Sequence, residues 1–559
     1  MGRALDISAM LKQASPATRR EILRIGAAGG IAAPALLAML AKEGVAPVYA
    51  APSAATLQET PVKGGTLVLI GHQEIASLHP DEATDGPTVH WVMVTQMFNA
   101  LVEQDENFQF FPVLAEAMPT VSDDGLTYTF KVRTGVTFHN GQDLTSADVK
   151  YTYEWYMNPD NAAINAANFS AIASVEAPDP TTVVVTLKEP YAPFLGRVAG
   201  TFIVPQADHE AKGKEGFGAA PVGTGAFKMK EWNAAAFTVV ERFDEHFRGA
   251  PNLDSVRLNV VPEPAQRTIG LETGEADSSV WTLVTEDHLR LEQDGRFKTY
   301  VTSATAINHF PLNNKNPKLS DKRVRQAMMF AIDRQAIIDD IWQGTATLAT
   351  ANLSPALAQF YSPDVAQYPY DPARAATLLD EAGWVLNGDV REKDGEPLSF
   401  TCTTITGDST RRGEAEIVQQ YLAEAGIQMN LEEAPVATIL EQMRAGQMDA
   451  AVFNWTYGGG FGDPDDGGTL ASDGASNYSH FENARVDELL TQGRREIDPE
   501  ARKAIYNEIQ TIVADEVPFL FMMYWDIYTI FNSRVQGLPE TVLSSDPVYL
   551  KAHEWWIAQ

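Results

Sequence analysis

Two short segments of this chain resemble ligand-binding loops, but each lacks residues that such a loop requires. Residues 223–228 (GTGAFK) have the glycines and lysine of a phosphate loop, but the third glycine and the Ser or Thr after the lysine are missing. Residues 463–468 (DPDDGG) begin like a calcium loop, yet its twelfth position is Gly474, where calcium needs a carboxylate. We interpret the second segment as a solvated turn of Asp and Gly.

Catalytic and metal-binding patterns are also missing elsewhere. The sequence has no HExxH or GxSxG pattern, and its ten histidines do not stand at metal-ligand spacing. Cys402 is the only cysteine, which excludes an intrachain disulfide, a CxxC pair and a four-cysteine zinc site. We therefore predict a protein with no catalytic residues, no metal and no cofactor. The rival class is an exported hydrolase, because a catalytic pair could hide among the 74 acidic residues.

The composition describes a large, acidic globular protein. With 559 residues, 45% of them apolar, the chain is long enough for three or four domain-sized units with buried cores. Its formal net charge of -32 repels phosphate backbones and anionic lipids. We expect no nucleic-acid partner.

The first fifty residues are typical of an export signal. Arg19 and Arg20 form a twin-arginine pattern, residues 25–40 are weakly apolar, and residues 48–50 (VYA) offer a cleavage point. The apolar stretch is shorter than the roughly 20 residues that span a bilayer. No cysteine follows it for lipid attachment. We predict a twin-arginine signal peptide at 1–50, a flexible lead-in at 51–62, and a mature periplasmic protein that is not integral to the membrane.

Hydrophobic periodicity predicts a mixed α/β chain. Strands are expected at 65–70, 126–133, 181–187 and 427–432, the second of them after a turn at Asp124 and Gly125. Helices are expected after Thr145 to residue 156, and at 89–103, 321–343, 372–382, 411–425, 486–492 and 499–514. Helices and strands alternate from about 310 to 530, whereas 110–220 is strand-rich with one helix. These two patterns of secondary structure indicate at least two lobes.

Several segments carry a family resemblance. Residues 114–116 (LAE), 122–141 (SDDGLTYTFKVRTGVTFHNG) and 144–149 (LTSADV) closely resemble the signature of the family 5 extracytoplasmic solute-binding proteins, the peptide/nickel-binding class of ABC importers. Residues 221–227, 271–277, 312–314, 324–334, 375–384 and 483–490 continue the resemblance in order. It covers roughly residues 63–550. It implies an α/β, two-lobed type II periplasmic-binding-protein fold with an extra α+β subdomain in the first lobe.

The resemblance also implies a domain plan and a role. Lobe I would comprise 63–99 with 221–307 and 530–559, its extra subdomain 100–220, and lobe II 308–529. The two lobes would close about a hinge onto a small solute. We expect a monomer that delivers this solute to the permease subunits of an ABC importer.

Positions similar to family pocket walls supply the candidate ligand-binding residues. Trp455, Tyr457, Tyr524 and Trp525 would form aromatic walls, and residues 85–88 the first-lobe contact loop; for each aromatic the alternative is core packing. The full set is Asp85, Gly86, Thr88, Trp281, Trp455, Thr456, Tyr457, Gly458, Asp463, Tyr524 and Trp525.

The ligand stays open at this point. In the family's peptide binders, a Trp is followed three residues later by an Asp that pairs with the peptide's α-ammonium. Here Trp455 is followed at that distance by Gly458. Either another carboxylate, Asp85 or Asp463, holds the amine, or the ligand is neutral, such as a small oligosaccharide that stacks on aromatic rings. Peptide is the leading alternative.

Overall fold

The computed structural model describes residues 61–558 except 83–88, 106–107, 281–282, 457–461, 541 and 543–545. The predicted signal peptide, and the lead-in up to residue 60, lie outside the described residues. Everything below concerns the compact unit Val62–Gln559. No helix of the described residues is both long and apolar enough to cross a membrane.

A mixed sheet, with ten strands among the described residues, runs through both lobes. Its path is β21 (Phe453–Thr456), β13 (Ala306–Pro311), β22 (Phe519–Asn532), β11 (Ser278–Val280), β1 (Thr66–Gly71), β10 (Ser255–Val260), β9 (Phe237–Arg242) and β8 (Phe227–Asn233). Two further strands, β12 (Phe297–Ser303) and β14 (Ala346–Leu348), also pair with β22. The expected buried strand at 65–70 is thus confirmed as β1.

Strand β22 connects the lobes. Its first part pairs with β13 and β14, and its second part with β12 and β11. The second connection is the passage from β12 to β13 at residues 304–305. The two passages lie side by side, because the amide of Ala304 donates to the carbonyl of Trp525 at 2.9 Å. Both lie a few residues before the lobe boundaries that the resemblance implied.

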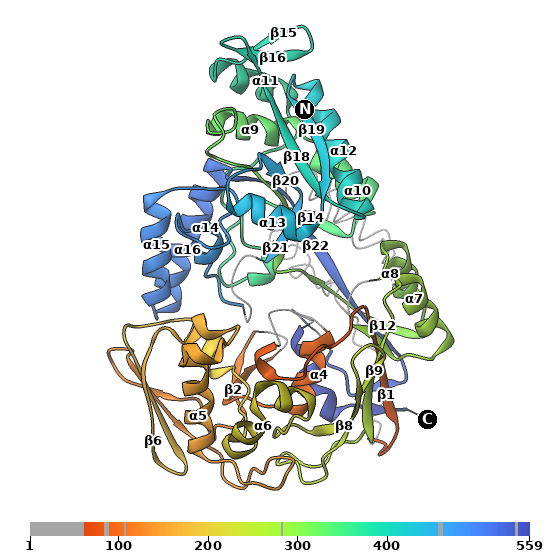
Figure 1. Ribbon diagram of the computed structural model, residues 1–559. Helices are drawn as coiled ribbons and strands as arrows, with labels where there is room; N and C mark the ends of the chain where they lie inside the picture. The colour runs from red at the N-terminus through yellow and green to blue at the C-terminus, as the bar shows by residue number, and fades with distance from the viewer. Residues whose placement is uncertain are drawn as a thin grey trace, which may run out of the picture. The chain divides into compact units, whose positions relative to one another are not determined.

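The second lobe is an α/β unit, drawn in green to blue in the upper part of Figure 1. Its parallel sheet has the order β19 (Gln428–Ala434), β18 (Ser399–Ile405) and β20 (Ala450–Ala451), and an antiparallel meander adds β15 (Val385–Asn387), β16 (Val390–Lys393) and β17 (Glu396–Pro397). The helices are α9 (Lys322–Ala331), α10 (Arg334–Ile341), α11 (Pro372–Glu381), α12 (Ser409–Glu424), α13 (Val436–Arg444), α14 (Gly467–Leu470), α15 (Ala484–Arg495) and α16 (Pro499–Glu516).

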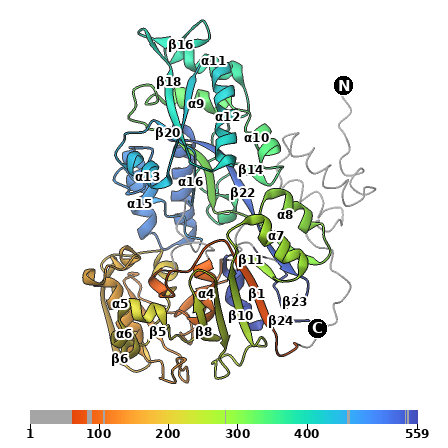
Figure 2. The same cartoon turned by 45° about the vertical axis from the view of Figure 1, so that its right-hand side comes forward.

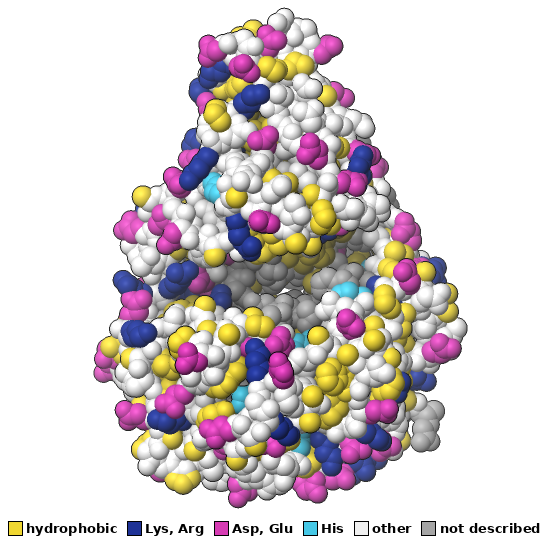
Figure 3. All heavy atoms as spheres, in the orientation of Figure 1, with side chains coloured by type: hydrophobic (Ala, Val, Ile, Leu, Met, Phe, Trp, Pro, Cys, Tyr) yellow, Lys and Arg dark blue, Asp and Glu magenta, His cyan; other side chains and the backbone are white. Residues whose placement is uncertain are grey.

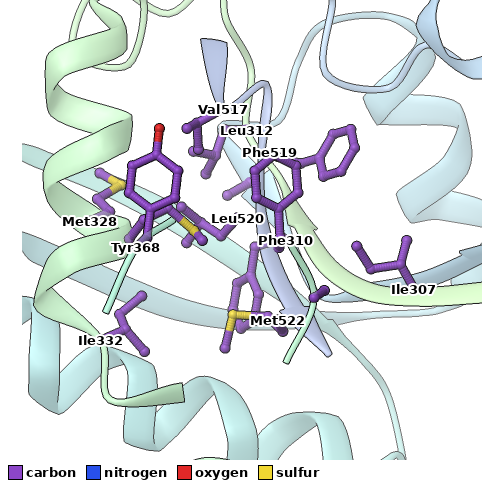
Figure 4. Packing of buried hydrophobic residues seen from close by; sticks show 14 of the residues in the cluster. Ile307, Phe310, Leu312, Met328, Ile332, Tyr368, Val517, Phe519, Leu520 and Met522 are labelled. Carbon is purple, nitrogen blue, oxygen red and sulfur yellow. The ribbon is translucent and has the colours of Figure 1, made fainter. Parts of the chain in front are cut away.

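The core of the second lobe lies between its sheet strands and these helices. Figure 4 shows Phe310 of β13 and Leu520 of β22 beside Met328, which comes from α9. All three side chains are at most 1% exposed. Burying such a side chain stabilises the fold by about 1.5 to 3 kcal/mol.

The first lobe carries the rest of the large sheet. Its helices are α4 (Val89–Met97), α7 (Pro264–Thr273) and α8 (Thr285–Glu292), and the short pair β23 (Val535–Gln536) and β24 (Trp556–Ile557) brings the chain's end back to it. In Figure 2, α7 and α8 lie beside β1 and β11. Met93 and Met97 of α4 are fully buried, as core packing requires.

Residues 100–220 form a subdomain with its own core. Its sheet has the order β4 (Thr120–Val121), β5 (Thr127–Lys131), β7 (Thr182–Leu187) and β6 (Ile172–Asp179), beside the pair β2 (Val102–Gln104) and β3 (Phe110–Pro112). The segment contains two α-helices, α5 (Ser146–Met157) and α6 (Gln206–Ala219); Phe217 of α6 packs in the core of the first lobe. A separate set of buried side chains between Leu101 and Ile203 fills this subdomain.

Local signals in the sequence account for most of these elements. Gly125 has φ of 70°, as the predicted turn before β5 requires. Asp148 accepts from the amide of Thr145 at 2.9 Å, which completes the predicted start of α5. The expectation of a single helical region at 321–343 was wrong. The chain forms α9 and α10, and Ile332 between them is extended at φ -98° and ψ 122°.

One further expectation needs correction. The segment 110–220 was expected to have one helix, but α6 also lies there. The glycines of α6 weaken its helical signal in the sequence, and Gly213 interrupts it with φ of 66°. The glycines of the GTGAFK segment serve close packing. A Cβ on Gly223 would collide with the backbone of Met97, and one on Gly225 with the backbones of Gln96 and Met97.

Candidate functional site

A cavity of about 560 Å³ lies between the extra subdomain and the second lobe. Figure 3 shows the hollow between the two parts of the molecule on this face. One side, the first-lobe wall, consists of Ala167, Asn168, Ser170, Ala171, Lys188, Glu189, Pro190, Tyr191 and Arg197. The other side, the second-lobe wall, consists of Trp455, Asp465, Asp466, Gly468, Thr469, Ser476 and Arg494.

Both walls combine the ends of regular elements with the segments beside them. The first-lobe wall takes its residues from a short helical turn at Ala166–Phe169, from the segment after β7 and from a second turn at Leu195–Ala199. The second-lobe wall combines the end of β21, the loop before α14, α14 with the segment after it, and the last turn of α15. The walls touch at one edge, where the amide of Ala192 donates to the carbonyl of Arg494 at 2.8 Å. Beside this contact, Arg495 forms an ion pair with Glu189.

Trp455 lies in the cavity wall and also on the core. Strand β21 holds it opposite Ile307 of β13. Its ring meets the ring of Tyr478 edge-on, with centroids 5.3 Å apart at 82°. The side chain is half-buried, and its remaining face lines the cavity. This arrangement provides a fixed aromatic surface for a ligand.

Asp463 does not offer a free carboxylate. It forms an ion pair with Arg502 at 2.9 Å, and the two side chains are 10% and 9% exposed. Burial lowers the pKa of Arg502, but attraction by Asp463 outweighs this effect and raises the pKa above its ordinary value. The structure thus places Asp463 next to the cavity lining with its charge compensated by Arg502, and its contact with a ligand stays a prediction.

The two following aspartates do line the cavity. Asp465 forms an ion pair with Arg494 at 2.9 Å, although its own side chain is only 8% exposed. Asp466 is 3% exposed and accepts a hydrogen bond from Asn352. The amide of Asp465 donates to Asp463 at 3.0 Å and that of Gly467 to Asp465 at 3.1 Å, so the segment is a set of Asx turns. Our expectation of a solvated turn was wrong for most of the segment, because Pro464, Asp466 and Gly467 are buried; Gly468 is exposed.

Tyr524 belongs to the core and not to the cleft. It is fully buried, its hydroxyl donates to the carbonyl of Ala351 at 2.8 Å, and the same hydroxyl accepts from the amide of Ala351 at 3.2 Å. Its predicted place in a ligand wall was therefore wrong. Trp525 is half-buried, packs against the second-lobe core and lies at the passage between the lobes. It is absent from the lining of the cavity described here.

Six of the other candidate residues lie outside the described part of the chain: Asp85, Gly86, Thr88, Trp281, Tyr457 and Gly458. The backbone of Thr456 continues β21 opposite Ala306, but its side chain is not described.

Sequence reasoning missed most of the charged lining. Lys188, Tyr191 and Arg197 follow a strand in the subdomain, and Arg494 lies in the last turn of α15; no local motif marks any of them. Burial raises the pKa of Tyr191 to about 12, so its hydroxyl keeps its proton and can donate to a ligand. Within the described part of the chain, no three His, Cys, Asp or Glu residues form a group suited to a metal ion.

The family model that matches this chain decides its identity. The model of the bacterial extracellular solute-binding proteins, family 5 Middle, matches residues 109–478. The chain belongs to this family. The resemblance inferred from the motifs is thereby confirmed, and the solute-binding protein has the type II periplasmic-binding-protein fold with its two lobes and extra subdomain.

Individual relatives are similar to this chain over most of its length. Protein XP55 of Streptomyces lividans is 32% identical over 457 residues, which are 79% of this chain and 81% of that protein. The glutathione-binding protein GsiB of Salmonella choleraesuis is 30% identical over 501 residues, 87% of this chain and 94% of its own. The structure of the oligopeptide-binding protein AppA from Bacillus subtilis in complex with a nonapeptide has a TM-score of 0.73 at 26% identity, covering 89% of this chain and 100% of that one.

These matches establish a solute-binding protein of the class that delivers ligands to ABC importers. The family is extracellular, and its members are binding proteins. The ligand of this member remains to be derived from its own cavity.

Proposed function

We propose that this protein captures short peptides in the cavity between its lobes and delivers them to the permease of an ABC importer. The observation that carries the proposal is the cavity itself, in which a fixed Trp455 ring faces charged groups on both walls. Its volume of about 560 Å³ falls within the range of small-molecule sites. Relatives named as glutathione-binding and oligopeptide-binding support a peptide-like ligand.

The charged lining favours a peptide over the alternative of a neutral oligosaccharide. Burying a charged side chain against an uncharged ligand costs free energy, because the charge loses water without gaining a partner. Six of the lining residues are Lys, Arg, Asp or Glu. Asp465 is already paired with Arg494, and Glu189 with Arg495. Lys188 forms no ion pair with a carboxylate of the described residues, and a peptide's carboxylate can compensate its charge where a neutral sugar cannot.

We propose that the two lobes close onto the ligand by bending at the two segments that connect them, residues 304–305 and 525–526. A ligand that touches both walls has more contacts in the closed state than in the open one, so it shifts the population toward closure. In this scheme residues 63–303 with 526–558 act as one lobe and residues 306–525 as the other. The importer would recognise the closed pair.

The N-terminal pattern supports export as a further part of the proposal. Arg19 and Arg20, followed by the apolar stretch at 25–40, favour the twin-arginine route to the periplasm. We propose that the mature protein acts there as a monomer. Replacing both arginines by lysine should retain the precursor in the cytoplasm, and light scattering of the purified mature chain should give a mass close to that of one copy.

The test is thermal unfolding of the mature protein against two panels, di- to pentapeptides and di- to tetrasaccharides. A ligand at 100 times its Kd adds about 2.7 kcal/mol to the free energy of unfolding, which gives a clear shift in Tm. Stabilisation by peptides supports the proposal, and stabilisation by sugars alone contradicts it. Mass spectrometry of each peptide after incubation tests the hydrolase rival, because a pure binding protein returns its ligand intact.

A further inference from the structure

Two buried side chains of the second lobe share a hydrogen bond that leaves two oxygens without a donor. Glu414 of α12 is 0% exposed and Asn308 of β13 is 2% exposed. The amide Nδ2 of Asn308 donates to Oε2 of Glu414 at 2.8 Å. The other two oxygens, Oε1 of Glu414 and Oδ1 of Asn308, are buried and have no hydrogen-bond partner among the described residues. As long as Glu414 is ionised, both oxygens can only accept.

One proton on Glu414 supplies the missing donor. A buried acceptor without a partner is costly, because it has lost its water and gained nothing in return. A protonated carboxyl donates through its O–H, and an amide offers both a donor and an acceptor. The two groups can then form a cyclic pair, in which Nδ2–H donates to Oε2 and Oε1–H donates to Oδ1. In agreement, burial raises the pKa of Glu414 to about 7.

The charged groups near Glu414 do not compensate a carboxylate there. Arg411 lowers the pKa of Glu414 and Asp408 raises it, and these two residues at the start of α12 form an ion pair with each other. On β18, burial and the charge of Glu414 raise the pKa of the Cys402 thiol, and on β13 burial lowers the pKa of His309 to about 3. The elements α9, α10 and β19 also pack against α12, but none of their described charged groups shifts the pKa of Glu414.

The pair lies one step along the sheet from the aromatic wall of the cavity. Asn308 stands opposite Asn454 in the ladder between β13 and β21, and the adjacent pair of this ladder contains Trp455. The start of α12 holds both strands, because Arg411 donates to the side chain of Asn454 while Glu414 accepts from Asn308. The ladder between β13 and β22 shifts its register directly after Asn308. Such an irregularity re-aims neighbouring side chains, so the position of Trp455 depends on how Asn308 is held.

We propose that Glu414 carries a proton in the folded protein and, together with Asn308, positions the strand that presents Trp455 to the ligand. Both are positioning residues, since neither lines the cavity. The inference rests on the proposed peptide function and adds a pH dependence to it. When Glu414 loses its proton, two buried acceptors face a single donor, the pair loosens, and ligand binding weakens.

The first experiment is isothermal titration calorimetry of the unmodified protein and Glu414→Gln at about pH 5.5 and about pH 8.5, on either side of the pKa of Glu414. The probe is the peptide that most raises Tm in the panel above. Glutamine replaces the O–H by an N–H, so the variant keeps a pair with two hydrogen bonds at both pH values. Between them we expect the unmodified protein to lose about tenfold in affinity relative to the variant, the equivalent of one hydrogen bond. Comparing the two proteins cancels the titration of the peptide's own amine.

Glu416→Gln is the matched control. Glu416 lies two residues further along α12, but its side chain is 49% exposed and forms an ion pair with Arg412 at 2.9 Å. This variant should keep the pH dependence of the unmodified protein.

The second experiment detects the proton itself by infrared difference spectroscopy at about pH 6, below the pKa of Glu414. The spectrum of the unmodified protein minus that of Glu414→Gln should contain the C=O band of a protonated carboxyl. Asp526, whose pKa burial raises to about 6, contributes equally to both proteins and cancels.

The outcomes separate this inference from the function on which it rests. Absence of the band overturns it, because Glu414 would then be ionised, with a bound water donating to the two oxygens. A parallel pH dependence of affinity in the unmodified protein and Glu414→Gln also overturns it, because the pair would then have no influence on Trp455. Failure of every peptide to bind contradicts the proposed function instead, and the infrared band still decides whether the acid–amide pair exists.

Discussion

The two walls of the cavity are built on different principles. The second-lobe wall is braced from behind: Asp463 is paired with Arg502, Asp465 with Arg494, and Trp455 is held by a strand and by the ring of Tyr478. The first-lobe wall instead presents Lys188 and Arg197, which are bonded to neighbouring loop atoms. The carboxylates of the second-lobe wall are paired with arginines of the same lobe, whereas the two cations of the first-lobe wall donate to a carbonyl and to an amide oxygen.

This difference suggests a division of labour in ligand capture. A braced wall pays little conformational entropy on binding, and so it suits a ligand's apolar surface. A wall with long cationic side chains can adapt to ligands of different length while still providing charge. The predictions below test whether the bracing, the aromatic surface and the contact between the walls act as this comparison requires.

The largest effect is expected from removing one member of the buried ion pair. Asp463→Asn leaves Arg502 buried, at 9% exposure, without its counter-charge. Breaking such a pair costs about 3 to 5 kcal/mol of the free energy of unfolding. Urea denaturation followed by circular dichroism measures it. The double variant Asp463→Asn with Arg502→Met should recover much of the loss, and a loss below about 1 kcal/mol in the single variant would contradict the bracing.

The aromatic surface of the second-lobe wall should dominate affinity. Trp455→Ala removes the ring that faces the cavity while keeping the backbone pairing of β21 with β13. We expect binding of the panel's best peptide to weaken about 100-fold, as for a residue central to a binding site. Trp342→Ala is the control, because Trp342 is also half-buried in the second lobe but lies outside the cavity lining. Unchanged affinity in Trp455→Ala would identify Trp455 as a core residue only.

A third prediction concerns a buried carboxylate of the same lobe that forms no ion pair among the described residues. Glu414 of α12 is fully buried and accepts from Asn308 at 2.8 Å. Burial raises its pKa from 4.5 to about 7. The folded state therefore binds more protons than the unfolded state between these values, and stability falls as pH rises from 4.5 to 7.

Glu414→Gln should remove this part of the pH dependence. The difference in unfolding free energy between variant and parent should grow in the variant's favour by about 2 to 3 kcal/mol from pH 4.5 to pH 7, and then level off. Asp526, whose pKa burial raises to about 6, contributes a slope of the same sign to both proteins and cancels in the difference. A difference that is flat with pH would show that Glu414 is ionised at little cost.

The scaffold of both walls could be predicted because its signals are local. The side chain of Asp371 accepts a hydrogen bond from the amide of Arg374 at 2.9 Å, and that of Asp498 accepts one from the amide of Ala501. These capping residues mark the starts of α11 and α16 in the sequence. The turn at Gly125 is equally local. Such elements need no knowledge of the rest of the fold.

The cavity lining could not be predicted in the same way, because it depends on which segments meet. Strand β22 shows the difficulty: its start reads FLFMMYW, without the alternation that would separate a core face from a cleft face. Tyr524 was consequently assigned to the cleft, although it is buried in the core. Lys188 and Arg494 are over 300 positions apart in the sequence, and only the way the two lobes pack together brings them to one cavity.

The smallest effect is expected where the two walls touch. Arg495 and Glu189 are 53% and 52% exposed, and an exposed ion pair contributes about 0.2 to 1 kcal/mol. Arg495→Gln should therefore leave the unfolding of each lobe unchanged, but it should weaken peptide binding by about two- to fivefold, because the pair exists only when the walls are together. The weakening should appear as faster dissociation in stopped-flow measurements and should disappear at high salt, which screens the pair in the unmodified protein as well. A loss that persists in 1 M salt would mean that Arg495 acts by its shape, and the contact between the walls would then rest on the backbone bond from Ala192 to Arg494.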